Sequence, residues 1–221
     1  MNHRTLPKSA HPLLRHLRYR LHSRLPRLYP GALCRIASDE AVAITIDDGP
    51  SAATRTLLDA LRKEDLHVTF FLTGSAALEH PRLVRAMLEA GHAIGTHGHA
   101  HDDLSRLEAD AVASDIRRSV TALTSAAGRA PELFRPPYGR LNPAHRHIVT
   151  ECGCRLVLWS SLPGDFDPSV SVAELRQRLD RLRAGDIVVL HDRETTADRT
   201  LSCIHHLGSL LRDRGLRTAT L

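Results

Sequence analysis

Short apolar runs alternate with longer helical patterns from Ala41 to the end of this chain of 221 residues. A run of about four to eight apolar residues between turn signals is typical of a buried strand, and apolar residues at helical spacing follow most of these runs. Parallel strands need a long crossover between them, usually a helix. The alternation therefore predicts an α/β fold with a parallel sheet. Strands are expected at 41–47, 67–73, 92–95, 133–135, 155–160, 186–190 and 217–220.

Three of the intervening helices carry boundary signals. Pro81 opens a helix that is expected to end at Gly91, because proline suits the first turn and glycine commonly ends a helix. Ser171 and Glu174 form a capping-box pattern at the start of another helix, which is expected to continue to Gly185. Between these two, a helix that stops at Gly128 is predicted by the apolar stripe Val112, Ile116, Val120 and Leu123.

Residues 1–38 form a basic extension ahead of a single domain at 39–221. No acidic residue precedes Asp39, whereas eight lysine and arginine residues do. Leucines repeat every four residues in the extension with arginines between them, so a helix there would be apolar on one side and cationic on the other. Such a helix could dock on the domain, or it could contact an anionic membrane surface peripherally. These leucines are Leu13, Leu17, Leu21 and Leu25.

No segment has the composition of a membrane span or of a secretory signal. No run approaches the roughly 20 apolar residues that cross a bilayer, and arginines interrupt every candidate for the apolar region of a signal peptide. The four cysteines are too sparse for a disulfide framework in a chain of this length. These features favour a cytoplasmic location, with contact at the inner membrane face if the extension binds lipid.

Potential metal ligands follow two of the predicted strands. The first strand ends in Thr-Ile-Asp-Asp-Gly-Pro, which places the adjacent carboxylates Asp47 and Asp48 where the strand turns into a loop. The third strand is followed by His97, His99 and His101, three histidines in a glycine-containing stretch. One carboxylate and two imidazoles would leave positions open on a bound ion, as is typical of catalytic metal sites.

Other polar clusters also follow strands. Arg135 to Gly139 comes after the fourth strand, Trp159 to Phe166 after the fifth, and Leu190-His191-Asp192 after the sixth. In parallel α/β folds the carboxyl ends of the strands share one side of the sheet, where sites are assembled from separate loops. We therefore expect these clusters to meet the two metal-ligand clusters at a single site.

These residues resemble the motifs of the polysaccharide deacetylases of carbohydrate esterase family four, which share the chitooligosaccharide-deacetylase homology domain. The resemblance extends over residues 41–221. The segment at 45–50 is similar to the first motif of the family, with Ile46 in place of phenylalanine. His97 and His101 match the spacing of the second motif, and Arg-Pro-Pro-Tyr at 135–138 is similar to the third.

The resemblance implies a distorted (β/α) barrel with about seven parallel strands, in line with the seven strands expected above. It also implies a metal centre in which Asp48, His97 and His101 are the ligands. Zinc is the metal expected first, with Co²⁺, Ni²⁺ or Mn²⁺ as alternatives. His99 is not a ligand in the family pattern, and we expect its side chain to face away from the ion.

The resemblance implies the catalytic groups as well. Asp47 would be the base, and Arg135 would hold its carboxylate in place. The backbone amide of Tyr138 would stabilise the oxyanion. His191 would act as general acid, supported by Asp165.

Three departures from the family pattern affect the surroundings of the site rather than its reacting groups. Gly98 stands where a serine or threonine usually steadies the loop between the two histidine ligands. Leu162 replaces a common aspartate, and Phe166 replaces a tryptophan beside the acetyl pocket. These changes are expected to alter the shape of the substrate cleft.

The implied reaction is hydrolysis of N-acetyl groups on an oligo- or polysaccharide, or a lipid-linked sugar, that contains N-acetylglucosamine. An O-acetyl sugar esterase is an alternative, because the same groups would attack an ester. A non-catalytic metal- or sugar-binding protein is a second alternative. A two-histidine, one-carboxylate iron oxygenase would share the ligand set, but it leaves Asp47 and His191 without a role. Nucleic-acid binding is not expected, since only 4% of residues are aromatic.

Overall fold

A seven-stranded sheet forms the centre of the structure, a computed structural model that describes residues 29–221. Its strand order is β5-β4-β3-β2-β1-β6, with β7 beside β1, and every pairing between these strands is parallel. The predicted parallel α/β fold is thus confirmed. The strands are β1 (Ala41–Asp48), β2 (Thr69–Leu72), β3 (Ala93–Thr96), β4 (Leu133–Phe134), β5 (Arg155–Leu156), β6 (Ile187–His191) and β7 (Arg217–Thr218).

The sheet curls until the chain beyond β5 reaches β6. The backbone amides of Ser160 and Ser161 donate to the carbonyl of Ile187 at 3.1 and 3.0 Å, and Val189 donates to the carbonyl of Ser161 at 3.0 Å. These hydrogen bonds link the two edges of the sheet. The expected distorted (β/α) barrel is therefore confirmed, with an irregular segment at its seam.

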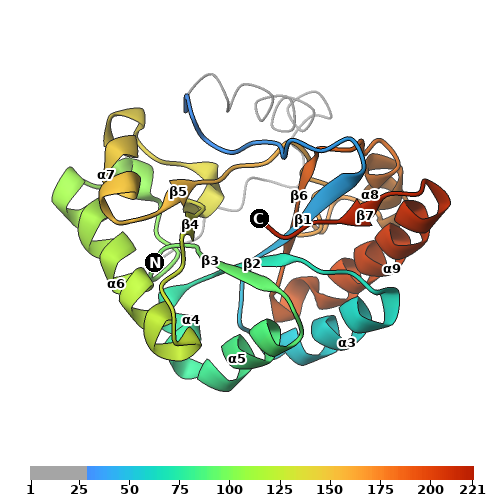
Figure 1. Cartoon of the computed structure of the whole chain (residues 1–221), viewed down its shortest axis with the longest axis horizontal. Helices are drawn as coiled ribbons and strands as arrows, with labels where there is room; N and C mark the ends of the chain where they lie inside the picture. Colours follow the sequence, from blue (N-terminus) through green and yellow to red (C-terminus); the bar gives the residue numbers. More distant parts are fainter. Residues whose placement is uncertain (1–28) are drawn as a thin grey trace.

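Helices surround the outside of the sheet, from α7 and α6 through α4, α5 and α3 to α9 and α8 (Figure 1). They are α3 (Thr54–Glu64), α4 (Gly74–Glu79), α5 (Pro81–Glu89), α6 (Ala109–Ala127), α7 (Arg146–Glu151), α8 (Val172–Leu179) and α9 (Ala197–Asp213). Four short 3₁₀ turns connect parts of the described chain: η2 (Leu104–Arg106), η3 (Pro137–Gly139), η4 (Pro143–His145) and η5 (Glu194–Thr196).

The predicted helix boundaries are confirmed for α5 and α6, and the predicted end of α8 is wrong. Gly128 ends α6 with a φ of 77°, a left-handed conformation that glycine adopts without strain. The capping box of Ser171 and Glu174 is present at the start of α8. This helix ends at Leu179, however, and not at Gly185 as predicted. Leu182 is buried in the turn that follows α8. The apolar spacing therefore extends beyond the end of the helix, which is why the spacing predicted too long a helix.

The two faces of β1 pack into different cores. Val42, Ile44 and Ile46 belong to the apolar cluster that contains residues of α3 and α9, whereas Ala43 belongs to the cluster of the opposite face with Phe71 and Val189. Side chains alternate between the faces of a strand. Asp47 therefore shares the face of Ala43, which is the interior of the barrel. In the parallel register between β1 and β6, Asp47 is the partner of His191.

The chain ahead of β1 lies against the barrel. Leu33 exchanges backbone hydrogen bonds with Leu156 and Leu158, at 2.9 and 2.8 Å. The hydroxyl of Tyr29 donates to the carbonyl of Leu141 at 2.5 Å. Ile36 then reaches Gly185, just before β6. Figure 1 shows this segment, in blue, crossing from β5 to β1.

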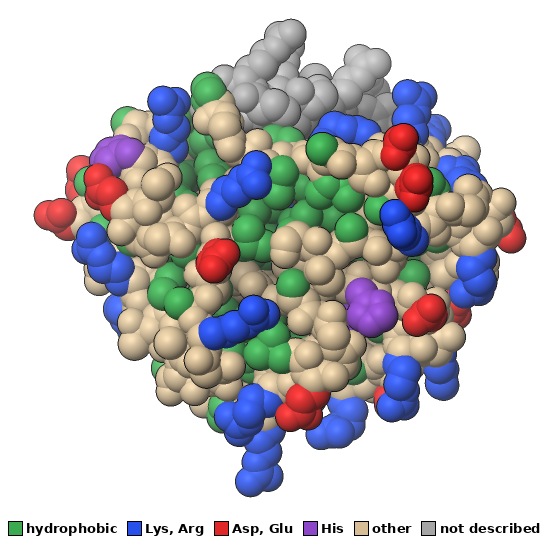
Figure 2. Space-filling model, viewed as in Figure 1, with side chains coloured by type: hydrophobic (Ala, Val, Ile, Leu, Met, Phe, Trp, Pro, Cys, Tyr) green, Lys and Arg blue, Asp and Glu red, His purple; other side chains and the backbone are tan. Residues whose placement is uncertain are grey.

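The leucine repeat of the predicted basic extension lies in residues 1–28, outside the described residues. Within residues 29–221, no helix is long and apolar enough to cross a membrane. On the face of the molecule shown in Figure 2, charged side chains lie mostly near the rim and hydrophobic side chains nearer the middle.

Candidate active site

The candidate site is assembled at the carboxyl ends of the strands, as expected for a parallel sheet. Asp47 and Asp48 are the last residues of β1, and His191 is the last residue of β6. His97 follows β3 directly, and Arg135 follows β4. Sequence positions almost 150 residues apart are therefore brought together by the ends of neighbouring strands.

Unusual backbone conformations occur within the site. Asp48, His101 and Tyr138 have φ values of 84°, 60° and 60°, a left-handed region that residues other than glycine rarely adopt. Such outliers concentrate at functional sites. At Asp48 this conformation breaks the alternation of side-chain directions along β1. Both adjacent carboxylates consequently reach the same histidine, since Nε2 of His97 lies 3.9 Å from Asp47 Oδ2 and 3.7 Å from Asp48 Oδ1.

Three potential metal ligands converge at this point. Oδ1 of Asp48 lies 3.0 Å from Nε2 of His101 and 3.7 Å from Nε2 of His97, and the three ligand atoms lie within 4.8 Å of one another. Nδ1 of His97 contacts the carbonyl of Arg135 at 2.7 Å, which turns its Nε2 toward Asp48. Oδ1 of Asp48 is buried and has no hydrogen-bond partner within residues 29–221. A buried carboxylate oxygen without a hydrogen bond, facing two imidazole nitrogens, fits a divalent cation.

The protonation states of these ligands also suit a metal. Burial lowers the pKa of His97 to about 4, so its imidazole is neutral near pH 7. Burial alone would raise the pKa of Asp48, but the nearby His101, His191, His97 and Arg193 side chains hold it well below its usual range. A charged carboxylate and a neutral imidazole are the forms that coordinate metal ions.

Asp47 is held by a buried arginine. NH1 of Arg135 donates to Oδ1 of Asp47 and to Oγ1 of Thr45, both at 2.6 Å. NH2 donates to the carbonyl of Leu158 at 3.0 Å, and the guanidinium lies 4.1 Å from the centre of the Phe71 ring. Arg135 is completely buried. These contacts orient the Asp47 carboxylate and leave Oδ2 on the side of the metal-ligand cluster.

His191 is paired with the buried carboxylate of Asp165. Oδ1 of Asp165 lies 3.0 Å from Nδ1 of the imidazole, and Thr200 donates to Oδ2 at 3.1 Å. Burial lowers the pKa of His191, but the carboxylates of Asp165, Asp48 and Asp47 together outweigh that effect and raise the pKa to about 9. The ring of Phe166 meets the imidazole edge-on, with 4.9 Å between ring centres. His191 is therefore a cation near pH 7, suited to donate a proton.

The turn after β1 is fixed by Asp192. Its carboxylate accepts hydrogen bonds from Ser51 at 2.6 Å and from Thr54 at 2.5 Å. A Cβ atom at Gly49 would lie 2.3 Å from Oδ2 of Asp192, so only glycine fits there. This contact explains the glycine of the Asp-Asp-Gly-Pro segment and ties the loops that follow β1 and β6.

Arg193 is a site residue that sequence reasoning missed. Its Nε donates to Oδ2 of Asp48, and its NH2 lies 3.5 Å from Nε2 of His101. The only signal in the sequence is its position, two residues after His191. Its guanidinium neutralises the oxygen of Asp48 that faces away from the two histidines.

The remaining predicted residues lie around this centre. Tyr138 is 51% exposed, and its ring meets that of His101 edge-on at 4.7 Å. Both residues line a cleft of about 1060 Å³, together with Asp48, Arg140 and Arg193. This volume is of the size of ligand pockets. The cleft opens directly onto the metal-ligand cluster.

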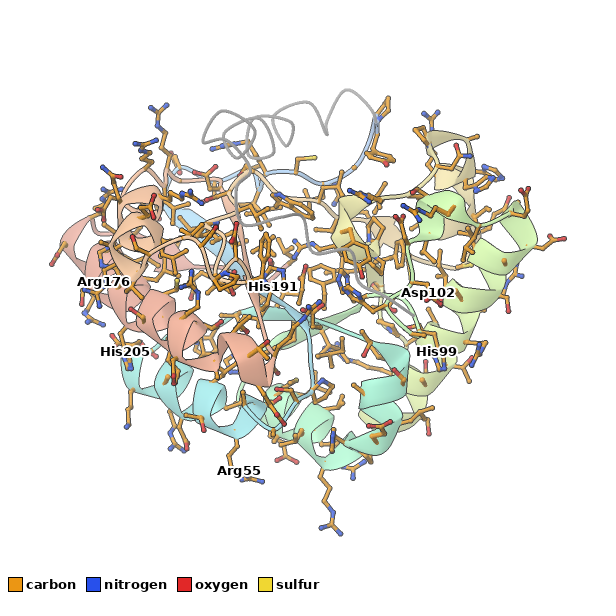
Figure 3. The ribbon with its side chains drawn as sticks, turned by 180° about the vertical axis from the view of Figure 1, so that it is seen from behind. Arg55, His99, Asp102, Arg176, His191 and His205 are labelled. Atoms are coloured by element: carbon orange, nitrogen blue, oxygen red, sulfur yellow. The ribbon has the colours of Figure 1, made fainter. Side chains whose placement is uncertain are left out.

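His99 does not join the cluster of Asp48, His97 and His101. Its backbone amide donates to Asp115 of α6, and its Nδ1 lies 2.5 Å from where a Cβ atom at Gly74 of α4 would be. In Figure 3 His99 is seen beside α6, while His191 lies near the middle of the view.

A cluster of potential metal ligands beside one carboxylate that can accept a proton and one imidazolium that can donate one is the arrangement of metal-dependent hydrolases. Comparison with known families agrees with this class. The chain belongs to the polysaccharide deacetylase family, whose model matches residues 35–157. The resemblance inferred from the motifs is thereby confirmed.

Characterised relatives support this membership. Over 188 residues the chain is 32% identical to a peptidoglycan-N-acetylglucosamine deacetylase of Bacillus cereus, covering 83% of this chain and 87% of that protein. It is also 32% identical to a peptidoglycan-N-acetylglucosamine deacetylase of Listeria monocytogenes over 176 residues, covering 77% of this chain. The match spans only 37% of the length of the Listeria protein.

A solved structure shows the same fold. The family 4 carbohydrate esterase of Streptomyces lividans, determined in complex with acetate, superposes with a TM-score of 0.77 at 34% sequence identity. The match covers 83% of this chain and 93% of the esterase.

Proposed function

We propose that this chain is a metal-dependent deacetylase that removes N-acetyl groups from N-acetylglucosamine units in an oligo- or polysaccharide or a lipid-linked sugar. The observation that carries the proposal is the convergence of Asp48, His97 and His101 beside Asp47, which is the direct partner of His191 in the register between β1 and β6. The deacetylase names of the relatives from Bacillus and Listeria support the same substrate class.

Asp48, His97 and His101 would hold a divalent ion, with zinc the first choice for one carboxylate and two imidazoles. When bound, the ion would polarise the acetyl carbonyl and lower the pKa of water from about 16 toward 7. Co²⁺, Ni²⁺ and Mn²⁺ are the alternatives to zinc. The buried oxygen of Asp48 without a hydrogen bond supports the presence of a cation.

Asp47 would take the proton of the attacking water through Oδ2, because Arg135 holds Oδ1. His191 would give its proton to the departing amine through Nε2, because Nδ1 faces Asp165. The protonated amine leaves more readily than an amide anion would. The backbone amide of Tyr138 is the proposed donor to the oxyanion, an interaction whose loss typically costs about 2.7–4 kcal/mol.

The cleft over the ligand cluster is polar and supports a sugar as substrate. His101 and Tyr138 form its wall next to the cluster, and Arg140 and Asp103 continue it outward as an ion pair at 3.1 Å. Charged and hydroxyl groups that are partly exposed can exchange water for sugar hydroxyl groups at little cost.

The test is release of acetate from N-acetylglucosamine oligomers by zinc-loaded and chelator-treated protein. Release that requires both zinc and Asp47 is expected, with Asp47→Asn as the inactive variant. An O-acetylated xylose oligomer in parallel separates the esterase alternative, which predicts release from the ester alone. Tight zinc binding without release from either substrate would favour a non-catalytic binding protein.

A further inference from the structure

Both histidine ligands lie on one short irregular segment, residues 97–101, which we call the ligand loop. His97 and His101 are at its two ends, and the segment between them is neither helix nor strand. Gly98 and His101 have positive φ values of 76° and 60°. A loop of this kind needs outside contacts to keep two ligands at fixed separation, since irregular backbone has no repeating hydrogen bonds of its own.

Helix α4 holds the carbonyl groups of the ligand loop. The backbone amide of Gly74 donates to the carbonyl of Gly98 at 2.9 Å, and that of Ser75 donates to the carbonyl of His99 at 3.0 Å. These donors belong to the first turn of α4, whose amides have no partner within the helix.

Helix α6 also holds the ligand loop. The carboxylate of Asp115 accepts the backbone amide of His99, at 3.0 Å to Oδ1 and 3.2 Å to Oδ2. The hydroxyl of Ser119 donates to the carbonyl of Gly98 at 2.9 Å. Asp115 and Ser119 are four residues apart, so they project from the same side of α6. His99 lies beside this helix in Figure 3.

A side chain at position 98 would occupy the space that the carboxylate of Asp115 fills. A Cβ atom on Gly98 would lie 2.9 Å from Oδ1 of Asp115, closer than real side chains approach. The family pattern places a serine or threonine at this point of the loop, where its hydroxyl group would form the steadying hydrogen bond. In this chain the side chain of Asp115 comes from α6 to the space beside Gly98 and binds the next amide of the loop.

We propose that Asp115 and Ser119 are positioning residues that set the separation of His97 and His101 and so determine the affinity for the metal. This inference rests on the metal site of the proposed function. Neither residue belongs to the cluster of potential ligands or lines the cleft above it. They act through the backbone of the ligand loop, as residues that orient metal ligands commonly do.

The first test is zinc affinity of the full chain, measured by calorimetry for Asp115→Ala, Asp115→Asn and Ser119→Ala. Asp115→Ala is expected to weaken zinc binding about 10- to 100-fold, a typical result of losing a group that orients a ligand. Asp115→Asn is expected to lose less, because its amide oxygen can still accept the N–H of His99. The matched control is Asp110→Ala, an exposed aspartate on the same helix.

The melting temperature without zinc separates positioning from folding. An Asp115→Ala protein that melts as the wild type does and binds zinc more weakly supports the inference. An Asp115→Ala protein that binds zinc as tightly as the wild type overturns it. Failure of the wild type itself to bind zinc overturns the metal site of the proposed function, a result that is distinguishable from the other two.

The second test is the coupling between Gly98 and Asp115. Gly98→Ala is expected to weaken zinc binding more in the wild-type background than in the Asp115→Ala background. In the Asp115→Ala background, the carboxylate oxygen that the new methyl group would meet is already absent. Residues in contact show such non-additive effects. Strictly additive losses would overturn the claim that the two side chains share one position.

Discussion

Oδ1 of Asp165 lies 3.0 Å from Nδ1 of His191, and Oδ2 of the same carboxylate accepts the backbone N–H of His191 at 2.7 Å. One buried carboxylate thus fixes both the main chain and the ring of the histidine. Nε2 is left to face the site. The pairing sets the tautomer and the charge of the imidazole together, which is the role expected of a carboxylate behind a catalytic histidine.

Asp165→Asn is expected to lower the pKa of His191 and to move the alkaline limb of the activity profile to lower pH. Burial disfavours the imidazolium, and in the wild type Asp165, with smaller contributions from Asp48 and Asp47, overcomes it and raises the pKa to about 9. Without that charge, burial is opposed mainly by Asp48 and Asp47, so the pKa falls. The measurement is kcat/KM for acetate release between pH 5 and pH 10, with Asp167→Asn as a neighbouring control. An unchanged alkaline limb would contradict the role of His191 as acid.

The pair of His191 and Asp165 also makes the free energy of unfolding depend on pH. The pKa of His191 is higher in the folded protein than its ordinary value of 6.5, so the stabilisation is complete below pH 6.5 and is lost as the pH rises through about 9. Urea unfolding at several pH values is expected to show this loss in the wild type. The loss is expected to be smaller in Asp165→Asn.

Asp47→Asn is expected to abolish catalysis while leaving the metal site intact. General base catalysis commonly contributes about 100- to 10,000-fold, and asparagine cannot accept the proton. The zinc affinity is expected to stay close to that of the wild type, because Asp48 and the two histidines remain. Acetate release and zinc calorimetry check the two parts, with Asp59→Asn on the exposed side of α3 as the control. A parallel loss of zinc binding would make Asp47 a ligand and not the base.

Arg135→Met is expected to destabilise the fold because it leaves the Asp47 carboxylate buried without its partner. Breaking a buried ion pair by removing one partner typically costs about 3–5 kcal/mol. The double variant with Asp47→Asn is expected to be more stable than Arg135→Met alone, since the uncompensated charge is gone. Urea unfolding of the two single variants and the double variant measures the difference. A double variant less stable than Arg135→Met would show that the ion pair is not the source of the loss.

Tyr29→Phe is expected to destabilise the protein by about 1–3 kcal/mol, the cost of leaving a buried polar group without its partner. The hydroxyl donates to the carbonyl of Leu141 and accepts its amide, at 2.5 and 3.1 Å, and Leu141 is 2% exposed. The loop that carries Tyr138 precedes Leu141 directly. Thermal unfolding tests the prediction, and a variant as stable as the wild type would show that these hydrogen bonds contribute little.

The strands and the main site residues were predictable because their signals are local. Buried strands are short apolar runs, and residues that follow several such strands meet at one side of a parallel sheet. The site residues that lie at strand ends or directly after them are Asp47, Asp48, His97, Arg135 and His191. The resemblance to the family then suggested what each would do.

The parts that were not predictable depend on packing between segments distant in sequence. Arg193 reaches Asp48 across two loops, and Asp115 binds His99 from a helix whose own pattern shows only its apolar stripe. The left-handed conformation of Asp48 has no sequence signal, because aspartate adopts it only where the surroundings demand it. The end of α8 at Leu179 was missed because Leu182 is buried by the turn that follows.

The register between β1 and β6 makes Asp47 and His191 direct neighbours on adjacent strands. Backbone hydrogen bonds hold such strands about 4.8 Å apart, whatever residues occupy the loops. The span between the proposed proton acceptor and proton donor is therefore a property of the sheet. The loops that carry Tyr138, Arg140 and Phe166 can change in sequence without changing that span. Sequence drift in the cleft would then alter which substrate the proposed deacetylase selects well before it altered the proposed proton transfers.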